Sequence, residues 1–295
     1  MALDGIHHVT NITGDAPANV DFYVNRLGLR MVKKTVNQDD PTVYHLFYAD
    51  EHGSPGADIT FFEYPGAGPG RAGAGMVHTI VWRVASEEAL DFWRERMGSV
   101  PFADPEGLRH DLVVATAPDQ PLIADHPEIP HELALQGFEG VRAYARDVEV
   151  RTAGLLDALG FERDGNRWTT RGAERGGWIE YDEAPEEPGI PGAGTVHHVA
   201  WSSELDEQEQ WRDRVREAGG RPTEVIDRFW FRSIYFREPS GVLYEIATKG
   251  PGFSTDEEPE HLGEQLILPP AFEHLRAQVE PMLTPLPNPR AQHTA

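Results

Sequence analysis

Two nearly identical stretches far apart in the chain decide the predicted fold: Gly5-Ile-His-His-Val-Thr10 and Thr195-Val-His-His-Val-Ala-Trp201. Two further stretches share their apolar pattern, Met76-Val-His-Thr-Ile-Val-Trp82 and Val141-Arg-Ala-Tyr-Ala145. Apolar residues that alternate or run together in this way predict β-strands that are half or fully buried. A pattern that occurs four times indicates a chain built from four related units.

A segment of helical character follows each of these strands. The first, residues 16–27, has apolar side chains at roughly helical spacing and stops at Gly28. Another begins at Ser86, a favourable N-cap residue, and has acidic residues in its first turn. The other two are residues 152–159 and 205–218, and a glycine follows each of them.

Short β-type stretches joined by Gly and Pro turns follow each helical segment, so the predicted unit is β-α-β-β-β. These stretches are residues 43–48 and 59–64, then 108–115, then 167–170 and 178–181, and finally 229–236 and 242–247. A single unit leaves one sheet face uncovered, whereas two paired units curve around a shared cleft. The predicted class is therefore α+β, with four βαβββ units paired into two domains whose curved mixed sheets enclose a cleft.

The positions of prolines in the sequence predict where the domains begin and end. The proline-containing stretch 121–137 is typical of a linker between two paired halves. We therefore expect the first two units to pair within residues 1–120 and the last two within residues 138–250. Residues 251–295 contain many prolines and predict an irregular tail that wraps the surface or frays at its end.

The composition is strongly acidic, with 49 Asp and Glu against 26 Lys and Arg and a net charge of −23. Such a surface repels phosphates and anionic lipid, so we expect neither a nucleic acid nor a membrane as a partner. It fits a salt-adapted host and an ordinary acidic bacterial enzyme equally well. No apolar run approaches the roughly 18 residues of a membrane span, and no signal-peptide pattern is visible. We expect a cytoplasmic protein that forms a homo-oligomer.

The absence of cysteine leaves His, Asp and Glu as the only candidate metal ligands. The chain offers two histidine pairs, His7-His8 and His197-His198. Since neighbouring residues on a strand point to opposite faces, only one histidine of each pair should enter a given cleft. The second unit has Thr79 at the place of the second histidine, so that place distinguishes the first and fourth units. His8 and His198 are therefore the predicted inward pair.

The predicted carboxylate ligand is Glu245, which stands in an otherwise apolar stretch. A buried charge there costs several kcal/mol unless it is paired or coordinated. Glu63 is a rival acid, but it lies seven residues after Gly56. Glu245 lies four residues after Gly241. The residue four after Gly56 is Thr60, and threonine is a poor ligand for iron or zinc. We therefore expect three ligands and interpret Glu63 as a strand-end residue.

Several longer motifs accompany these residues, and in combination they are specific. They are residues 5–10, 44–50, 53–56, 131–138, 196–200, 227–248 and 252–257. With them, nearly the whole chain resembles the vicinal oxygen chelate superfamily of glyoxalases, bleomycin-resistance proteins and extradiol-type dioxygenases. Within that superfamily it closely resembles the hydroquinone-type ring-cleaving dioxygenases.

The resemblance implies that the same two histidines and glutamate hold Fe(II), or alternatively Mn(II), and so enclose a metal cleft. It also implies that four residues act beside the ligands: Arg228, Tyr235, His7 and His197. Arginine can stabilise negative charge on oxygen, and tyrosine can donate a hydrogen bond or relay a proton. Without the resemblance, the ordinary interpretations are a surface salt bridge for Arg228 and a core aromatic for Tyr235. Tyr235 should lie opposite Glu245 if the turn at residues 238–241 makes a three-residue loop.

The expected function is that of an Fe(II)-dependent, extradiol-type dioxygenase. Its substrates would be dioxygen and a small hydroquinone-type or catechol-type diol, and both oxygen atoms would enter the product. Two alternatives stay open. A glyoxalase-like isomerase would need a second acidic ligand, and a non-catalytic small-molecule binding protein would not need a metal triad at all.

Overall fold

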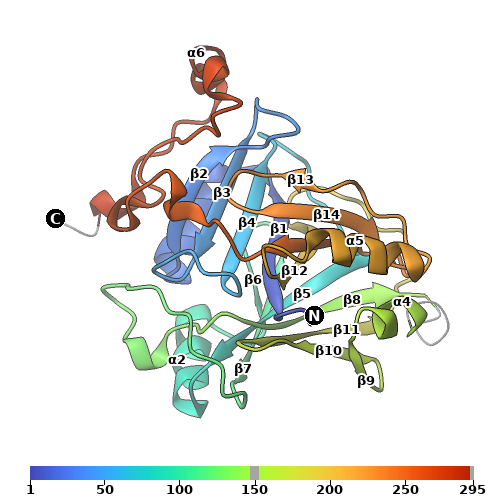
Figure 1. Cartoon of the computed structure of the whole chain (residues 1–295). Helices are drawn as coiled ribbons and strands as arrows, with labels where there is room; N and C mark the ends of the chain where they lie inside the picture. Colours follow the sequence, from blue (N-terminus) through green and yellow to red (C-terminus); the bar gives the residue numbers. More distant parts are fainter. Residues whose placement is uncertain (147–152, 293–295) are drawn as a thin grey trace.

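The computed structural model describes residues 1–146 and 153–292 of the chain. Its strands form two sheets with both parallel and antiparallel neighbours, the larger in the upper part of Figure 1 and the smaller in the lower part. The larger sheet contains eight strands and the smaller contains seven. The α+β class predicted from the sequence is therefore confirmed.

The larger sheet combines the first and fourth units. The first unit contributes β1 (Ile6–Thr13), β2 (Arg30–Val36), β3 (Tyr44–Ala49) and β4 (Asp58–Glu63). The fourth contributes β12 (Thr195–Ser203), β13 (Ile226–Asp227), β14 (Arg232–Arg237) and β15 (Leu243–Thr248). The strand order is β13-β14-β15-β12-β1-β4-β3-β2, so β1 and β12 pair at the centre, where they run antiparallel.

The smaller sheet combines the second and third units in the same manner. Its strands are β5 (Met76–Val84), β6 (Phe102–Ala103), β7 (Arg109–Val114), β8 (Phe138–Ala145), β9 (Glu162–Asp164), β10 (Arg167–Arg171) and β11 (Gly176–Glu183). Their order is β6-β7-β5-β8-β11-β10-β9, with β5 and β8 antiparallel at the centre. The second unit is shorter than predicted, because only two strands, β6 and β7, follow its helix.

The predicted pairing of consecutive units is wrong, because the first unit pairs with the fourth and the second with the third. The stretch 121–137, with the 3-10 turn η2 (His131–Leu133), connects two units of the same sheet. The chain instead crosses between the sheets at residues 64–75 and 184–194, and these two segments are bridged to each other. The first crossing is rich in glycine, which gives a backbone the freedom to change direction.

In the described part of the chain, the α-helices before the C-terminal segment are few and short. They are α1 (Ala16–Val20), α2 (Glu87–Met97), α4 (Ala153–Ala158) and α5 (Gln208–Glu217). The predicted cap of α2 is present, since Ser86 accepts a hydrogen bond from the Ala89 backbone N–H. The predicted helix at 16–27 is α-helical only over α1 and continues as a π-helical turn, η1 (Asp21–Arg26). The beginning of the predicted helix at 152–159 lies outside the described residues.

The C-terminal segment packs on the larger sheet (Figure 1, red). It contains η3 (Phe253–Thr255), η4 (Pro259–His261), η5 (Glu273–Leu275), α6 (Arg276–Val279), η6 (Glu280–Met282) and η7 (Pro289–Gln292). Lys33 of β2 is fully buried and donates to Asp256 (2.8 Å) and to Glu257. Its ammonium lies 5.0 Å from the centre of the Trp230 ring. A buried charge needs such partners, so this cluster fixes the segment to the sheet.

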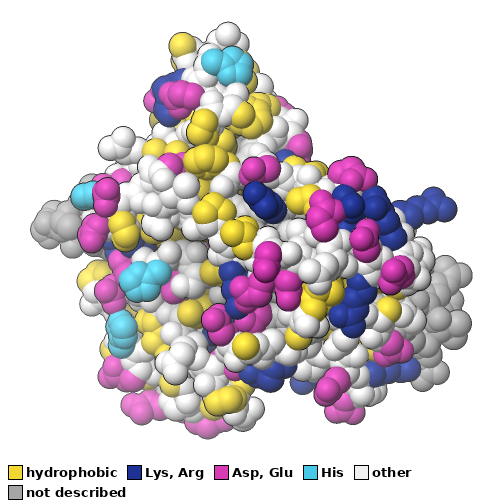
Figure 2. All heavy atoms as spheres, in the orientation of Figure 1, with side chains coloured by type: hydrophobic (Ala, Val, Ile, Leu, Met, Phe, Trp, Pro, Cys, Tyr) yellow, Lys and Arg dark blue, Asp and Glu magenta, His cyan; other side chains and the backbone are white. Residues whose placement is uncertain are grey.

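Two properties of the described residues bear on possible partners. Acidic side chains are spread over the face drawn in Figure 2, in places beside Lys and Arg. No helix among the described residues has the length and apolar character to span a membrane.

A buried chain of hydrogen bonds joins the first unit to the second. The Trp82 indole N–H donates to Nδ1 of His110 (3.1 Å), so the proton of this neutral ring is on Nε2. That N–H donates to the Tyr23 hydroxyl (3.0 Å), which donates to Asp104 (3.1 Å). Burial lowers the pKa of His110 to about 3, so the ring is neutral near pH 7.

Replacing His110 by Gln should flatten the pH dependence of stability. Because the folded pKa lies below the ordinary value of about 6.5, the unfolded chain binds the proton first as the pH falls, and native stability is lost in that window. Between roughly pH 4 and 6, the free energy of unfolding should fall more steeply in wild type than in His110→Gln, by about 1.4 kcal/mol per pH unit.

Urea unfolding at several pH values measures this difference in slope. Burial raises the pKa of Asp104 to about 6, which gives a slope of opposite sign, but this contribution is present in both proteins. Equal slopes in the two proteins would contradict a neutral, buried His110.

Candidate metal centre

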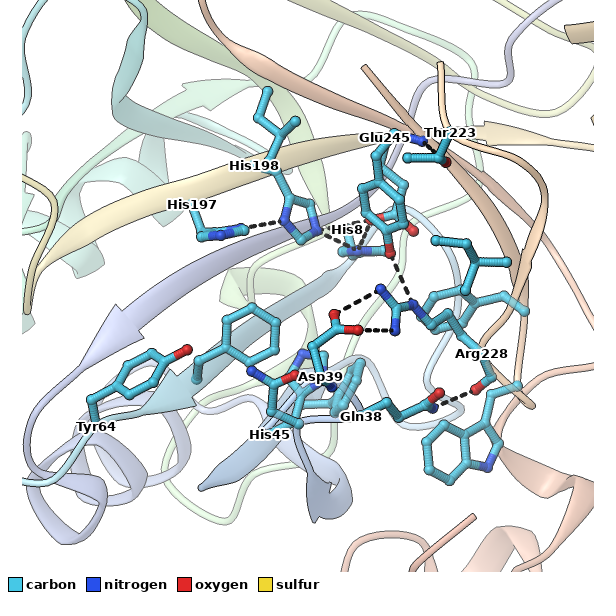
Figure 3. A pocket seen from close by; sticks show the side chains of 18 residues that line it. His8, Gln38, Asp39, His45, Tyr64, His197, His198, Thr223, Arg228 and Glu245 are labelled. Carbon is cyan, nitrogen blue, oxygen red and sulfur yellow. Dashed lines mark hydrogen bonds and ion pairs between the residues drawn. The ribbon is translucent and has the colours of Figure 1, made fainter. Parts of the chain in front are cut away.

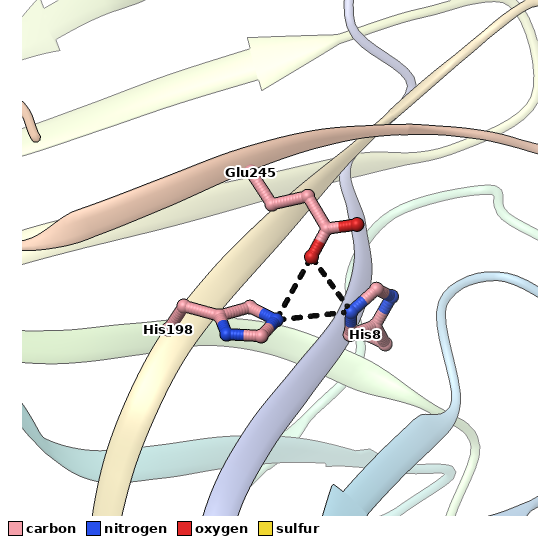
Figure 4. Close-up of side chains that lie close together, drawn as sticks. All are labelled: His8, His198 and Glu245. Carbon is pink, nitrogen blue, oxygen red and sulfur yellow. Dashed lines mark hydrogen bonds and ion pairs between the residues drawn. The ribbon is translucent and has the colours of Figure 1, made fainter. Parts of the chain in front are cut away.

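Three side chains from β1, β12 and β15 converge in the larger sheet (Figure 4). One oxygen of Glu245, Oε2, lies 3.1 Å from Nε2 of His8 and 2.8 Å from Nε2 of His198. The two Nε2 atoms are 3.3 Å apart, and all three residues are buried. Within residues 1–146 and 153–292, no other group of three His, Asp or Glu residues brings its ligand atoms this close together.

The arrangement fits a single metal ion. Three ligand atoms about 2.1 Å from an ion and at right angles to one another lie about 3.0 Å apart, close to the three distances found here. Burial opposes the charge of Glu245, but His8 and His198 hold the pKa of this carboxyl well below its usual range. Burial also lowers the pKa of His198. Metal binding requires the carboxylate to be ionised and the imidazoles to be neutral.

Each of these histidines follows another histidine that lies at a β-bulge. The register between β1 and β12 skips His7 on one strand and His197 on the other. A bulge interrupts the alternation of side chains, so neighbouring rings can face one another. The Nδ1 atoms of His7 and His8 are 2.9 Å apart, and those of His197 and His198 are 2.8 Å apart. The prediction that only one histidine of each pair enters the cleft is wrong for the second pair, since both His197 and His198 line the cavity.

The bulge fixes the protons on the rings. His7 donates from Nε2 to the backbone carbonyl of Thr248 (3.0 Å). Burial lowers the pKa of His7 to about 3, so the ring is neutral and its Nδ1 can only accept, from the Nδ1–H of His8. In a neutral His8 the lone pair is therefore on Nε2, the atom that faces Glu245, and this is the tautomer that a metal ligand requires.

The second pair follows the same logic. With its Nε2 lone pair directed at Glu245, His198 donates from Nδ1 to Nδ1 of His197. Burial, followed by the nearby His198, lowers the pKa of His197 to about 4. The neutral His197 ring then has its N–H on Nε2, at the edge of the cavity.

The three side chains lie at one side of a cavity of about 390 Å³ (Figure 3). One wall comes from the fourth unit and includes Tyr235, Arg228 and Leu243. The facing wall comes from the first unit and includes Phe47 and Phe62. The cavity therefore combines apolar walls with a polar, buried floor, which is the usual character of a small-molecule site.

Tyr235 and Arg228 both line this cavity, as the predicted roles require. Tyr235 pairs directly with Glu245 across β14 and β15. The backbone bond from Glu238 to Val242 (3.1 Å) closes the three-residue loop on which this placement depends. The Arg228 Nε–H donates to the Tyr235 hydroxyl oxygen (3.3 Å), so the hydrogen of that hydroxyl stays available to a ligand.

Arg228 also forms a two-pronged ion pair with Asp39, with distances of 2.9 and 3.2 Å. Asp39 belongs to the first unit, so this pair joins the two walls (Figure 3). Burial works against the charge of Arg228, but Tyr235 and Asp39 raise its pKa above the ordinary value. Arg228 is therefore both a salt-bridge residue and a residue of the cavity.

The register explains why the site has three candidate ligands and not four. Thr60 pairs with Thr10, two residues after His8, as Glu245 pairs with Ala200, two residues after His198. Thr60 thus occupies the place equivalent to that of Glu245.

The rival acid Glu63 lies outside the cavity. Its Oε1 accepts from the Ala16 backbone N–H (3.3 Å) and from the Thr284 hydroxyl (2.7 Å). These contacts fit the strand-end role predicted for it.

Equivalent positions in the smaller sheet lack the ligand set. The His78 ring contacts Thr79 through Nδ1 at a bulge like those of the histidine pairs (2.9 Å). Thr79 stands in place of His8, and Gly140 stands in place of His198. Glu180 is the counterpart of Glu245, but it forms an ion pair with Arg142 (2.8 Å).

Sequence reasoning missed three residues of the site: Asp39, His45 and Ser233. Ser233 donates to the second oxygen of Glu245 and so orients the carboxylate. His45 lines the cavity from β3. The signal for Ser233 and His45 is their register in β14 and β3 relative to Glu245 and Thr60, which becomes visible only when the first and fourth units are superposed. Asp39 lies in the loop before β3 and has no such signal.

Comparisons with known proteins agree with this architecture. The chain is 37% identical to a Bacillus subtilis protein that has been assigned the name ring-cleaving dioxygenase MhqA, over 97% of this chain and the whole of that one. It is 32% identical to chlorohydroquinone/hydroquinone 1,2-dioxygenase of Sphingobium indicum, over 94% of this chain and 95% of the relative. A crystal structure assigned as a Bacillus subtilis dioxygenase superposes with a TM-score of 0.89 at 38% identity, over 97% of this chain and 98% of that one.

The family model matches residues 5–109 and 140–246, which together cover most of the four units and include the three converging side chains. By this match and by the similarity to its relatives, the chain belongs to the Glyoxalase/Bleomycin resistance protein/Dioxygenase superfamily.

Proposed function

We propose that this protein is an Fe(II)-dependent, extradiol-type dioxygenase that cleaves the ring of hydroquinone-type or catechol-type aromatic diols. The observation that supports this most is the buried group of His8, His198 and Glu245 beside a cavity with aromatic walls. Two imidazoles and one carboxylate on one side of an ion leave positions open for substrate and dioxygen. The names of the relatives point to the same reaction class.

The donor set favours Fe(II), with Mn(II) as the alternative, because both ions accept nitrogen and oxygen ligands in open sites. A bound ion of this kind supplies Lewis acidity and a path for electrons between an aromatic diol and dioxygen. In the proposed reaction, a ring bond beside a hydroxyl-bearing carbon breaks, and both oxygen atoms enter the product.

The protein's own groups bind and orient the diol. The Tyr235 hydroxyl stays protonated, because burial raises its pKa above the ordinary value, so it can donate to a negatively charged oxygen of the substrate. Arg228 orients that hydroxyl through its Nε–H. The N–H on Nε2 of His197 offers a second donor at the cavity edge. Donors that are already fixed in place stabilise developing negative charge without reorganisation.

The aromatic walls suit a flat ring. Phe47 and Phe62 lie on one wall, and Trp230 and Phe231 also line the cavity. The Phe231 ring lies 5.4 Å from the His8 ring. Aromatic side chains in such positions stack on a substrate ring and exclude water from the reacting atoms.

The site argues against a glyoxalase-like isomerase, which needs a second acidic ligand. The place equivalent to Glu245 is Thr60, whose hydroxyl is already bonded to His45 and Thr10. A non-catalytic binding protein would have no use for a buried carboxylate between two oriented imidazoles.

Oxygen uptake after anaerobic Fe(II) loading tests the proposal. With hydroquinone or catechol, the wild-type protein should consume oxygen in proportion to the diol. His198→Ala should abolish both the uptake and the stoichiometric iron, because it removes one of three ligands.

His78→Ala is the control for loss of a strand histidine, since His78 occupies the place in the smaller sheet that is equivalent to that of His7. It should keep both iron and turnover. If His198→Ala retained its iron and turned over at the wild-type rate, the ligand assignment would be refuted.

Tyr235→Phe should slow turnover by roughly tenfold to a hundredfold and leave the iron content near that of wild type. We expect the fold to tolerate phenylalanine at position 235, because the equivalent position on the facing wall is occupied by Phe47. Steady-state oxygen uptake and iron analysis on the same samples measure the two effects. If Tyr235→Phe also lost its iron, the Tyr235 hydroxyl would have a structural role instead.

A further inference from the structure

His45 lies on the cavity wall opposite the candidate ligands and has no role in the reaction described above. It belongs to β3, and Figure 3 shows it on the other side of the cavity from His198 and Glu245. Its ring packs between Phe47 and Phe62, with ring centres 4.0 and 4.4 Å away. Two aromatic neighbours hold the ring in one orientation.

The hydrogen bonds of His45 determine which nitrogen faces a ligand. The Thr60 hydroxyl donates to the Thr10 hydroxyl (2.8 Å), so it must accept from Nε2 of His45 (2.9 Å). The proton of the neutral ring is thus on Nε2, and Nδ1 has a free lone pair. Within the described part of the chain, no hydrogen bond to Nδ1 is found, and this atom is not among the fully buried polar atoms that lack a partner, so it is at least partly accessible.

The surroundings keep this ring neutral. Burial, followed by the nearby His8 and His198, lowers the pKa of His45 well below its ordinary value. Nδ1 is therefore a hydrogen-bond acceptor near pH 7.

The two walls differ at equivalent positions. His45 pairs with Phe62, two residues after Thr60, and Ser233 pairs with Ala247, two residues after Glu245. His45 is thus the counterpart of Ser233. The serine donates to the carboxylate that faces the proposed metal, whereas the histidine donates to the threonine that replaces that carboxylate. The β14–β15 hairpin of the fourth unit thus orients a candidate metal ligand. The equivalent β3–β4 hairpin of the first unit presents a hydrogen-bond acceptor instead.

Several other polar groups of the cavity are already engaged or are donors. Asp39 is paired with Arg228, and the Thr223 hydroxyl oxygen accepts from the Tyr235 backbone N–H (3.1 Å). The Tyr235 hydroxyl and the His197 N–H can donate. A diol held through one oxygen at the candidate metal site brings a second hydroxyl that needs an acceptor, because a buried hydroxyl without one is costly.

We propose that Nδ1 of His45 accepts the hydrogen bond of the diol's second hydroxyl, the one remote from His8, His198 and Glu245. His45 is then a specificity-determining residue that favours aromatic rings with two hydroxyls at opposite ends. This inference rests on the proposed function, since it assumes that the first hydroxyl is held at the candidate metal centre.

Two substitutions of His45 test the roles of its two ring nitrogens separately. His45→Gln places an amide near Nε2 and can keep the bond to Thr60, but it leaves no acceptor at the place of Nδ1. His45→Asn keeps an oxygen near the place of Nδ1. The probes are hydroquinone and 4-methoxyphenol, whose methylated oxygen cannot donate. His261→Gln, on the exposed C-terminal segment, is the control for loss of a histidine.

In iron-loaded protein, His45→Gln should lower kcat/KM for hydroquinone by roughly tenfold to a hundredfold, mainly through KM, with unchanged iron content. Anaerobic calorimetry should show the same loss in hydroquinone binding and no change for 4-methoxyphenol. His45→Asn should restore most of the loss, and His261→Gln should behave as wild type.

Wild-type hydroquinone kinetics in His45→Gln would overturn the proposal. So would equal losses for both probes without rescue by asparagine, which would mark a structural role. If the wild type consumed no oxygen with any diol, the proposed function would fail. The calorimetric comparison would still decide the role of His45, since binding of the second hydroxyl does not require turnover.

Discussion

The antiparallel pairing of β1 with β12 is the constraint on which the rest of the structure depends. It joins the first and last units of the chain and places His8 beside His198 at the centre of one sheet. A bulge on each strand brings a second histidine alongside the first. Because His7 is fixed by the Thr248 carbonyl, the bulge also decides which nitrogen of His8 is free.

The neighbouring hairpins build different chemistry onto this common frame. In the fourth unit, β14 and β15 supply Glu245, with Ser233 and Tyr235 around it. In the first unit, β3 and β4 supply Thr60 and His45 at equivalent places. One hairpin therefore completes the candidate metal site, and the other presents aromatic side chains together with an acceptor at His45. The difference between the two walls turns a cleft with equivalent sides into a site with two different ends.

Much of this arrangement is visible in the sequence, because it follows from repetition. The repeated strands revealed the units, and the comparison with Thr79 singled out His8 and His198, which the structure brings together with Glu245. A metal site with His8 and His198 requires the first and fourth units to be neighbours. The prolines in residues 121–137 nevertheless led to the prediction of a linker there, and so to the pairing of consecutive units. The glycine-rich crossing at residues 64–75 was the better guide, because the backbone must change sheets there.

What the sequence could not provide depends on register. Strict alternation along a strand does not anticipate a bulge, so the contact between His197 and His198 was unexpected. His45 stands in an ordinary alternating strand, and its counterpart Ser233 has different chemistry, so no repeat marks it. The ion pair of Asp39 with Arg228 joins residues from opposite ends of the chain, and neither position resembles the other.

The central claim is that His8, His198 and Glu245 hold one ion with open positions facing the cavity. Crystals of metal-free protein, soaked anaerobically with Fe(II) and measured at the iron absorption edge, test it directly. The account predicts one anomalous peak about 2.1 Å from Nε2 of both histidines and from a Glu245 oxygen. A peak at another place, or no peak while the same iron-loaded protein consumes oxygen with hydroquinone, would contradict it.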